Sequence, residues 1–147
     1  MSDLRELYQE VILDHNKRPR NFRVAEPHTH HADGYNPLCG DKVTIYVQVV
    51  DGVVEDVSFQ GEGCAISTAS ASILTEVVKG KRIDEAQQLF ERFHDLVTMD
   101  DASAGPELGK LAVLAGVKDY PNRVKCATLA WHTLHAALEE RESISTE

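Results

Sequence analysis

The strongest constraint on the fold is a pair of alternating segments on either side of Asp51-Gly52. Apolar residues occupy every second position over residues 42–50, and a less regular alternation covers residues 53–60. Such alternation places apolar side chains on one face of a strand, and Asp-Gly is a preferred pair for a two-residue hairpin turn. The two segments therefore predict a β-hairpin, in which Glu55 interrupts the apolar face as expected near a sheet edge.

Helical spacing of apolar residues covers most of the remaining chain. It predicts helices over about 3–15, 64–79, 83–97, 107–115 and 121–141. Residues 16–40 and 98–106 contain prolines and glycines and are expected to form loops, and the tail 142–147 is expected to fray. The order of helix, strands and helices predicts one α+β domain over residues 1–147. We expect a small antiparallel sheet, with hairpin 42–60 at its centre and helices packed on one face.

Composition narrows the classes of partner. The chain has 147 residues, 42% of them hydrophobic, and a formal net charge of −9. This acidic balance disfavours nucleic acids and anionic membranes, which attract basic surfaces, and favours protein partners. No apolar run approaches the length needed to span a bilayer, and the first residues do not resemble a signal peptide. We therefore expect a cytoplasmic protein whose thiols stay reduced.

The three cysteines lie at the predicted boundaries of helices and strands. Cys39 precedes the first hairpin strand, and Cys64 follows the second, at a helix start. Because antiparallel strands bring the start of one beside the end of the other, Cys39 and Cys64 are expected at the same end of the sheet. Asp41 lies two residues after Cys39, on the same face of an extended segment. Cys126 lies in the first turns of the last helix, where the helix dipole favours a thiolate.

Three thiolates and one carboxylate are suitable ligands for tetrahedral Zn²⁺, or for an iron–sulfur cluster with one non-cysteine ligand. The basic side chains of Arg123 and Lys125 would lower the pKa of the neighbouring Cys126 thiol further. Spacing alone also allows the cysteines to be buried or unrelated thiols, and no C-x-x-C pair indicates a zinc finger.

A histidine cluster at His28, His30 and His31 is a second candidate for metal binding. It lies in a polar segment with no cysteine nearby in sequence, so a solvated loop is the plainer interpretation.

Four motifs together resemble one known family. The first is Asp14-His15 followed by Pro19-Arg20-Asn21, and the others are Cys39-Gly40-Asp41, residues 61–67 and residues 125–131. In this order they resemble the IscU/NifU family of iron–sulfur cluster assembly proteins, over residues 4–140. The chain is most similar to the SufU-like branch of that family. Lys125 stands where the scaffold branch has a histidine before its third cysteine, and the stretch between Cys64 and Cys126 is longer than in that branch.

The resemblance implies a zinc-dependent sulfurtransferase of iron–sulfur cluster biogenesis. It implies that Cys39, Asp41, Cys64 and Cys126 hold Zn²⁺, and that sulfur passes from a SufS-like cysteine desulfurase to downstream iron–sulfur assembly proteins. Arg123 would stabilise the anion or position the ligands. Two alternatives remain open at this point. One is an assembly scaffold that binds an iron–sulfur cluster transiently, and the other is a non-catalytic, zinc-stabilised activator of the desulfurase.

Cys39 is the expected sulfur acceptor. A zinc ion with four protein ligands is closed to chemistry, so sulfur transfer needs one ligand to leave. Cys64 and Cys126 are expected at helix starts, where moving the thiol means moving a packed helix. Cys39 is instead flanked by Pro37 and Gly40, where the backbone can rotate more freely. Once released, its thiolate would attack the persulfide of the desulfurase.

Overall fold

The structure is a computed structural model that describes residues 2–24, 28–37, 40–98, 114, 121–139 and 143–145. Its helices and strands, in chain order, are α1 (Ser2–Lys17), β1 (His30–Asn36), β2 (Asp41–Val50), β3 (Val53–Glu62), α2 (Ala65–Val78), α3 (Ile83–Thr98), α5 (Pro121–Leu138) and β4 (Ser143–Ser145). The predicted helix over 107–115 lies outside the described residues, apart from position 114. A single domain over residues 1–147 stays a prediction.

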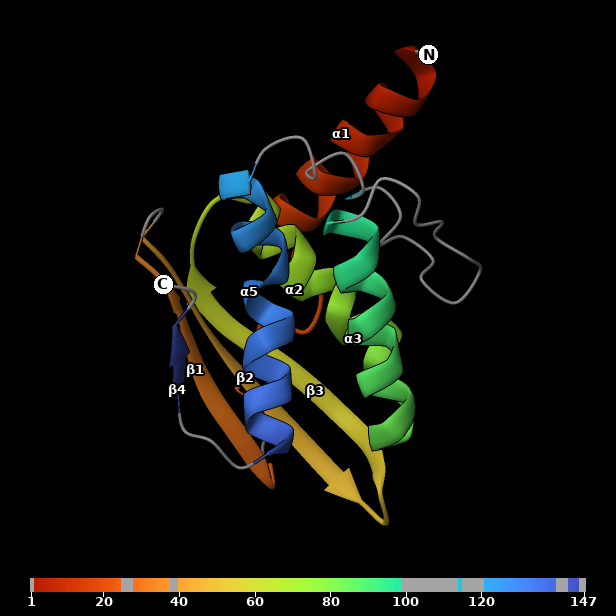
Figure 1. Ribbon diagram of the computed structural model, residues 1–147, viewed down its shortest axis with the longest axis vertical. Helices are drawn as coiled ribbons and strands as arrows, with labels where there is room; N and C mark the ends of the chain where they lie inside the picture. The colour runs from red at the N-terminus through yellow and green to blue at the C-terminus, as the bar shows by residue number, and fades with distance from the viewer. Residues whose placement is uncertain are drawn as a thin grey trace.

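The sheet has the strand order β3-β2-β1-β4 (Figure 1). The pairs β1–β2 and β2–β3 are antiparallel, and β4 is parallel to β1. Val50 pairs with Val53 across the Asp51-Gly52 turn, and both turn residues have positive φ, as the predicted two-residue hairpin requires. The predicted hairpin is therefore confirmed; β2 lies inside the sheet, and β3 forms one of its edges.

Glu55 interrupts the alternation of β3 because the strand bulges there. Gln48 pairs with Asp56 and Val49 pairs with Val54, so Glu55 is the extra residue between two consecutive pairs. The bulge changes the phase of the strand, so that Val54 and Val57 both face the core although they are three residues apart.

Two predicted irregular segments contain strands. Residues 30–36, within the predicted loop 16–40, form β1, whose inward positions are Ala32, Gly34 and Asn36. These side chains are small or polar, so the strand lacks the apolar alternation that sequence reasoning relies on. A Cβ atom at Gly34 would collide with Thr133 Oγ1 of α5, so glycine allows the close packing of this helix on the strand. The predicted frayed tail is also wrong over 143–145, since β4 pairs with β1 there.

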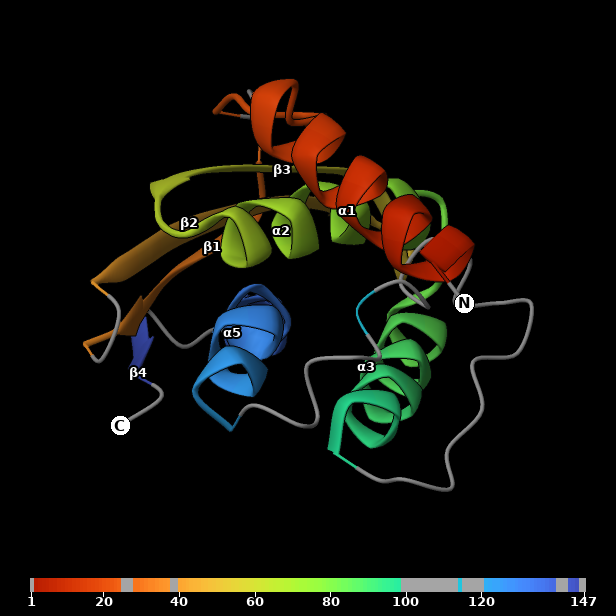
Figure 2. The same cartoon turned by 90° about the horizontal axis from the view of Figure 1, so that it is seen from above.

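The helices cover one face of the sheet, as predicted (Figure 2). α2 and α5 lie against the strands, α1 packs on α2, and α3 packs beside α5. Between α3 and α5, the rings of Phe93 and Trp131 stack with centroids 5.4 Å apart, and both are fully buried. Burial of each of these side chains stabilises the fold by about 3 kcal/mol.

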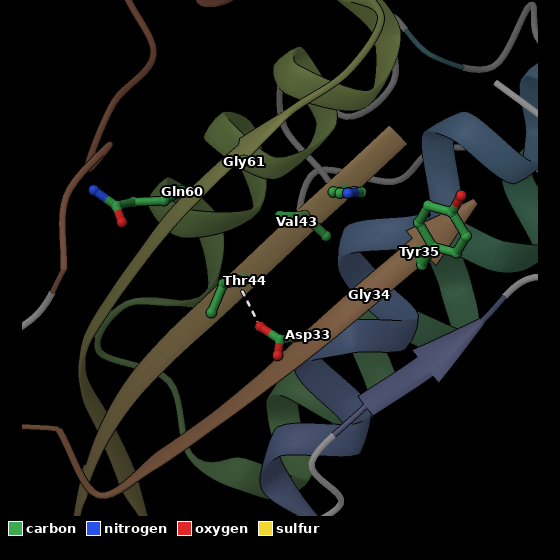
Figure 3. A pocket seen from close by; sticks show the side chains of 8 residues that line it. Asp33, Gly34, Tyr35, Val43, Thr44, Gln60 and Gly61 are labelled. Atoms are coloured by element: carbon green, nitrogen blue, oxygen red, sulfur yellow. Dashed lines mark hydrogen bonds between the residues drawn. The ribbon is translucent and has the colours of Figure 1, made fainter. Parts of the chain in front are cut away.

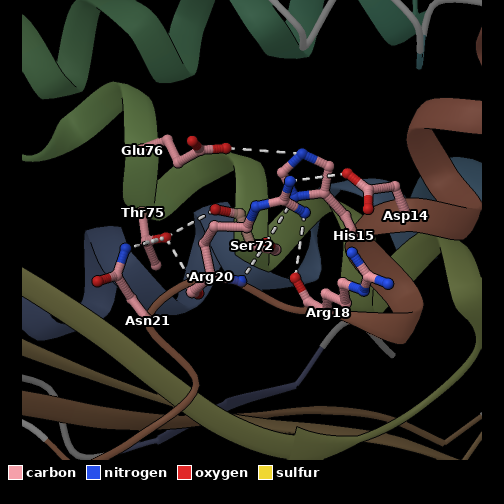
Figure 4. A network of polar contacts seen from close by, with 8 residues as sticks. All are labelled: Asp14, His15, Arg18, Arg20, Asn21, Ser72, Thr75 and Glu76. Atoms are coloured by element: carbon pink, nitrogen blue, oxygen red, sulfur yellow. Dashed lines mark hydrogen bonds and ion pairs between the residues drawn. The ribbon is translucent and has the colours of Figure 1, made fainter.

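A polar network fixes α2 to the N-terminal segment (Figure 4). The Ser72 hydroxyl lies 2.7 Å from Nδ1 of the buried His15 and accepts a 2.8 Å hydrogen bond from the backbone N–H of Arg20. Asn21 Nδ2 donates to Thr75 Oγ1 at 3.0 Å. The motif residues His15, Arg20 and Asn21 thus hold the helix that carries Cys64 at its start.

Candidate metal centre

The β2–β3 hairpin brings Asp41 and Cys64 together. Asp41 is the first residue of β2, and Cys64 follows the end of β3, which pairs with that start. The backbone N–H of Cys64 donates to Asp41 Oδ1 at 2.9 Å, and Cys64 Sγ lies 3.9 Å from Asp41 Oδ2. A Cβ atom at Gly63 would lie only 2.8 Å from Asp41 Oδ1. Glycine at position 63 therefore makes room for the carboxylate.

Cys64 is the N-cap of α2. Its φ and ψ angles of −69° and 167° are extended, and the backbone N–H of Ser67 donates to its Sγ at 3.4 Å. The N-cap side chain commonly accepts such a bond from the first turn of the helix, where amide groups lack helical partners. The sulfur is therefore held at the positive end of the helix dipole.

α5 supplies the third candidate ligand, Cys126. Cys126 is 3% exposed and lies near the start of α5, the helix that lies over β1 and β2 (Figure 1). The ligand atoms of Asp41, Cys64 and Cys126 all lie within 4.8 Å of one another, and Asp41 is completely buried. Within the described ranges this is the only group in which three histidine, cysteine or acidic ligands converge.

The site favours an ionised thiol at Cys64. Its pKa is lowered from 9.0 to about 6. The largest cause is a hydrogen bond with the Cys126 side chain; burial opposes the shift, and the backbone N–H of Ser67 adds to it. The Asp41 carboxylate disfavours a second negative charge nearby. The surroundings of Cys64 therefore favour its thiolate, the form that ligates a metal.

Of the two remaining predicted site residues, the structure describes Arg123 but not Cys39. Cys39, the predicted fourth ligand and sulfur acceptor, lies outside the described residues. Its neighbour Gly40 has a φ of 71°, a left-handed conformation that glycine adopts without strain. Arg123 lies on the exposed surface of α5, one helical turn before Cys126 and outside the buried cluster, so its role stays a prediction.

The histidines of the predicted second cluster lie around β1. His28 and His31 pack edge to face at 5.4 Å, and both contact the ring of Tyr46. His30 Nδ1 lies 2.7 Å from the hydroxyl of Thr29. In the part of the chain that the structure describes, these histidines do not form a three-ligand group. Their arrangement is an aromatic cluster rather than the geometry of a metal site.

An open depression of about 620 Å³ lies where β1, β2 and β3 run side by side (Figure 3). Its lining includes Tyr35, Thr44 and Gln60, and Thr44 donates a 2.6 Å hydrogen bond to Asp33 within it. Asp41, Cys64 and Cys126 do not line it, so it is separate from the candidate metal centre.

Asn36 is a site residue that sequence reasoning did not single out. It is the cross-strand partner of Asp41, it is fully buried, and its Nδ2 lies 3.8 Å from Cys126 Sγ. In sequence it looks like a turn residue before Pro37. The pairing of β1 with β2 and the packing of α5 on the sheet together reveal that it faces the sulfur.

Comparison with known proteins decides the family. The family described as NifU-like N terminal domain matches residues 7–127 of this chain. The chain belongs to this family. The Bacillus subtilis protein named zinc-dependent sulfurtransferase SufU is 39% identical over 141 residues, covering 96% of this chain and 95% of that protein. The Streptococcus pyogenes protein named iron-sulfur cluster assembly scaffold protein IscU is 40% identical over 145 residues, covering 95% of this chain and 87% of that protein.

A solved structure confirms the fold. The crystal structure titled putative iron-sulfur cluster assembly scaffold protein for the SUF system, from Fervidobacterium islandicum, superimposes with a TM-score of 0.82 at 35% identity. The superposition covers 88% of this chain and 94% of the Fervidobacterium chain. The resemblance to the IscU/NifU family and its SufU-like branch is therefore confirmed. No helix among the described residues is long and apolar enough to cross a membrane.

Proposed function

We propose that this chain is a zinc-dependent sulfur-transfer protein of iron–sulfur cluster biogenesis. The observation that carries the proposal is the convergence of the ligand atoms of Asp41, Cys64 and Cys126 within 4.8 Å of one another, with Asp41 and Cys126 buried and Cys64 half-buried. Similarity to a protein named zinc-dependent sulfurtransferase, over almost the full length of both chains, supports zinc and sulfur transfer in particular.

The donor atoms fit zinc. Two sulfurs and one carboxylate oxygen are typical zinc ligands, and a fourth ligand would complete the tetrahedral set of a structural site. We assign the fourth position to Cys39, from the sequence and the family resemblance. A buried carboxylate beside two ionisable thiols also favours a cation, because unpaired negative charges are costly away from water. Bound there, Zn²⁺ would keep its cysteine ligands deprotonated.

Cys39 would perform the transfer once its sulfur is released. Its thiolate attacks the terminal sulfur of the desulfurase persulfide, a new S–S bond forms on Cys39, and the S–S bond of the desulfurase breaks. The desulfurase cysteine leaves as a thiolate, so the exchange consumes no oxidant or reductant. Arg123, exposed one turn from Cys126, would stabilise the approaching anion. The persulfide then passes to downstream iron–sulfur assembly proteins in the cytoplasm, where thiols stay reduced.

Mass spectrometry tests the assignment of the acceptor. The zinc-loaded protein is incubated with its cysteine desulfurase and free cysteine, then alkylated and digested. The extra sulfur should appear first on the peptide that contains Cys39, and Cys39→Ser should remove it. Sulfur that appears first on Cys64 or Cys126, with Cys39 unmodified, would contradict the assignment.

A cluster-assembly scaffold is the second candidate, favoured by the 40% identity to the Streptococcus pyogenes protein that carries that name. Metal analysis of freshly purified, anaerobically prepared protein separates the two. The sulfur-transfer protein should be colourless and hold one zinc per chain, and a scaffold should be brown and hold iron and sulfide. The third possibility, a non-catalytic activator, would raise desulfurase turnover without carrying a persulfide on Cys39.

A further inference from the structure

The inward face of β1 has an unexpected polar side chain where it meets the metal centre. Its other inward residues, Ala32 and Gly34, are small enough for α5 to pack closely. Asn36, the third inward residue, is completely buried. A buried amide costs stability unless its polar atoms find partners, so its presence needs an explanation.

The two ends of the Asn36 amide differ in their contacts. Nδ2 donates toward Cys126 Sγ at 3.8 Å, within the range of hydrogen bonds to sulfur. Oδ1 is buried and accepts no hydrogen bond from any residue that the structure describes. An apolar side chain of the same shape would remove the cost of burying Oδ1. The favourable contribution of the amide is therefore its contact with the sulfur.

The position of Asn36 links the ligand on α5 to the ligands on the hairpin. Asp41 and Cys64 are already joined by the 2.9 Å backbone hydrogen bond. Cys126 comes from a different element, and Asn36 is the direct cross-strand partner of Asp41. A donor fixed beside Asp41 and aimed at Cys126 Sγ sets the direction of that sulfur relative to the carboxylate. Groups that hydrogen-bond to metal ligands in this way orient them and commonly change metal affinity when they are replaced.

We propose that Asn36 is a positioning residue of the metal centre, whose side-chain N–H holds Cys126 Sγ in the direction in which it ligates the metal. The proposal rests on the proposed zinc function. It assigns to Asn36 neither ligation nor contact with the transferred sulfur.

Two substitutions test the donor against a packing role. Asn36→Leu keeps the approximate shape of the side chain and Asn36→Ala removes most of it, but both lack the N–H donor. We expect both to lower zinc affinity about 10- to 100-fold, measured by competition with a chelator. If Asn36 acted only by filling space, the zinc affinities of the two variants would instead differ, because leucine fills the site and alanine does not. Thr133→Val is the matched control: it removes a buried hydrogen bond to Leu129 O in α5, away from the ligands, and should leave zinc affinity unchanged.

Two further measurements identify a positioning effect. In the cobalt-substituted protein, the sulfur-to-metal charge-transfer absorption should change in both Asn36 variants and not in Thr133→Val. The metal-free Asn36→Leu variant should unfold at the same temperature as the wild type or higher, since it loses a buried unpaired carbonyl.

The outcomes separate this proposal from the proposed function. Wild-type protein that binds no zinc overturns both. Wild-type protein that binds zinc, with Asn36 variants of equal affinity and an unchanged cobalt spectrum, overturns only the role of Asn36. If metal-free Asn36→Leu loses as much unfolding free energy as it loses in zinc-binding free energy, Asn36 has a structural role. That result also overturns the proposed positioning role. If Asn36→Leu does not fold, Asn36→Ala alone decides by its affinity and spectrum.

Discussion

Gly63→Ala tests the geometry of the metal centre with a single methyl group. The new Cβ atom would lie 2.8 Å from Asp41 Oδ1 and 3.2 Å from Asp41 Cγ. Gly63 is not among the residues with positive φ, so alanine meets no backbone strain of that kind. The substitution therefore acts through its contact with the carboxylate.

The size of the effect follows from the distances. To reach an ordinary C···O contact of about 3.3 Å, the carboxylate oxygen must retreat by roughly 0.5 Å. This retreat stretches the 2.9 Å hydrogen bond from the Cys64 backbone N–H beyond a good length. Loss of a hydrogen bond to a charged group costs about 1.5–3 kcal/mol. We expect displacement of this ligand to weaken zinc binding about 10- to 100-fold, as measured by chelator competition.

Gly80→Ala is the matched control. Gly80 has a φ of 87°, and its added Cβ atom would meet nothing within 4 Å. Alanine there strains the backbone by about 1 kcal/mol, which should lower the unfolding temperature and leave zinc affinity unchanged. If Gly63→Ala binds zinc as tightly as the wild type, then Asp41 does not ligate the metal through the carboxylate position seen here.

Three further predictions concern the ligand, the polar network and pH. Asp41→Ala should weaken zinc binding and alter sulfur transfer without unfolding the hairpin; wild-type affinity and activity would exclude Asp41 as a ligand. Ser72→Ala should lower the free energy of unfolding by about 1–3 kcal/mol in urea titrations, because two polar groups lose their partner. Ser58→Ala is its control: Ser58 is equally buried, but its hydroxyl has no hydrogen-bond partner among the described residues, so its loss should be neutral or stabilising. The pKa of His132 lies below 6.5, chiefly because burial disfavours the charged imidazolium. The charges of His94 and His135 lower it further. The folded protein therefore resists protonation at this site, and its stability should fall as the pH drops below 6.5. His132→Asn should reduce this loss of stability at low pH. An unchanged dependence of stability on pH would contradict the assignment of the loss to His132.

Sequence reasoning succeeded where side-chain pattern and local geometry agree. The Asp51-Gly52 turn between apolar strands predicted the hairpin, and antiparallel pairing predicted Cys39 and Cys64 at one end of the sheet. Cys39 lies outside the described residues, but Asp41, two residues later, lies beside Cys64. The start of α5 near Pro121 placed Cys126 in an early helical turn, as observed.

The sequence pattern failed where tertiary packing, rather than hydrophobicity, determines the structure. β1 turns a glycine and an asparagine inward because α5 packs closely against it, so its buried face has no apolar period. β4 has only three residues, too few to show an alternation, and is a strand only through its pairing with β1. The role of Asn36 depends on both a strand pairing and a helix contact, neither of which leaves a local signal.

The three candidate ligands that the structure describes come from segments that are far apart along the chain. Asp41 and Cys64 are 23 residues apart. Cys126 follows Cys64 after roughly 60 residues, and a cross-link over such a span removes about 4 kcal/mol of unfolded-chain entropy in the loop-closure estimate. A bound ion that joins these segments would therefore stabilise the tertiary structure in the way that a disulfide does. Because α5 is synthesised after the hairpin and α2, a chain still growing on the ribosome lacks one sulfur of the site. Metal binding by all three residues would thus require that α5 has been synthesised.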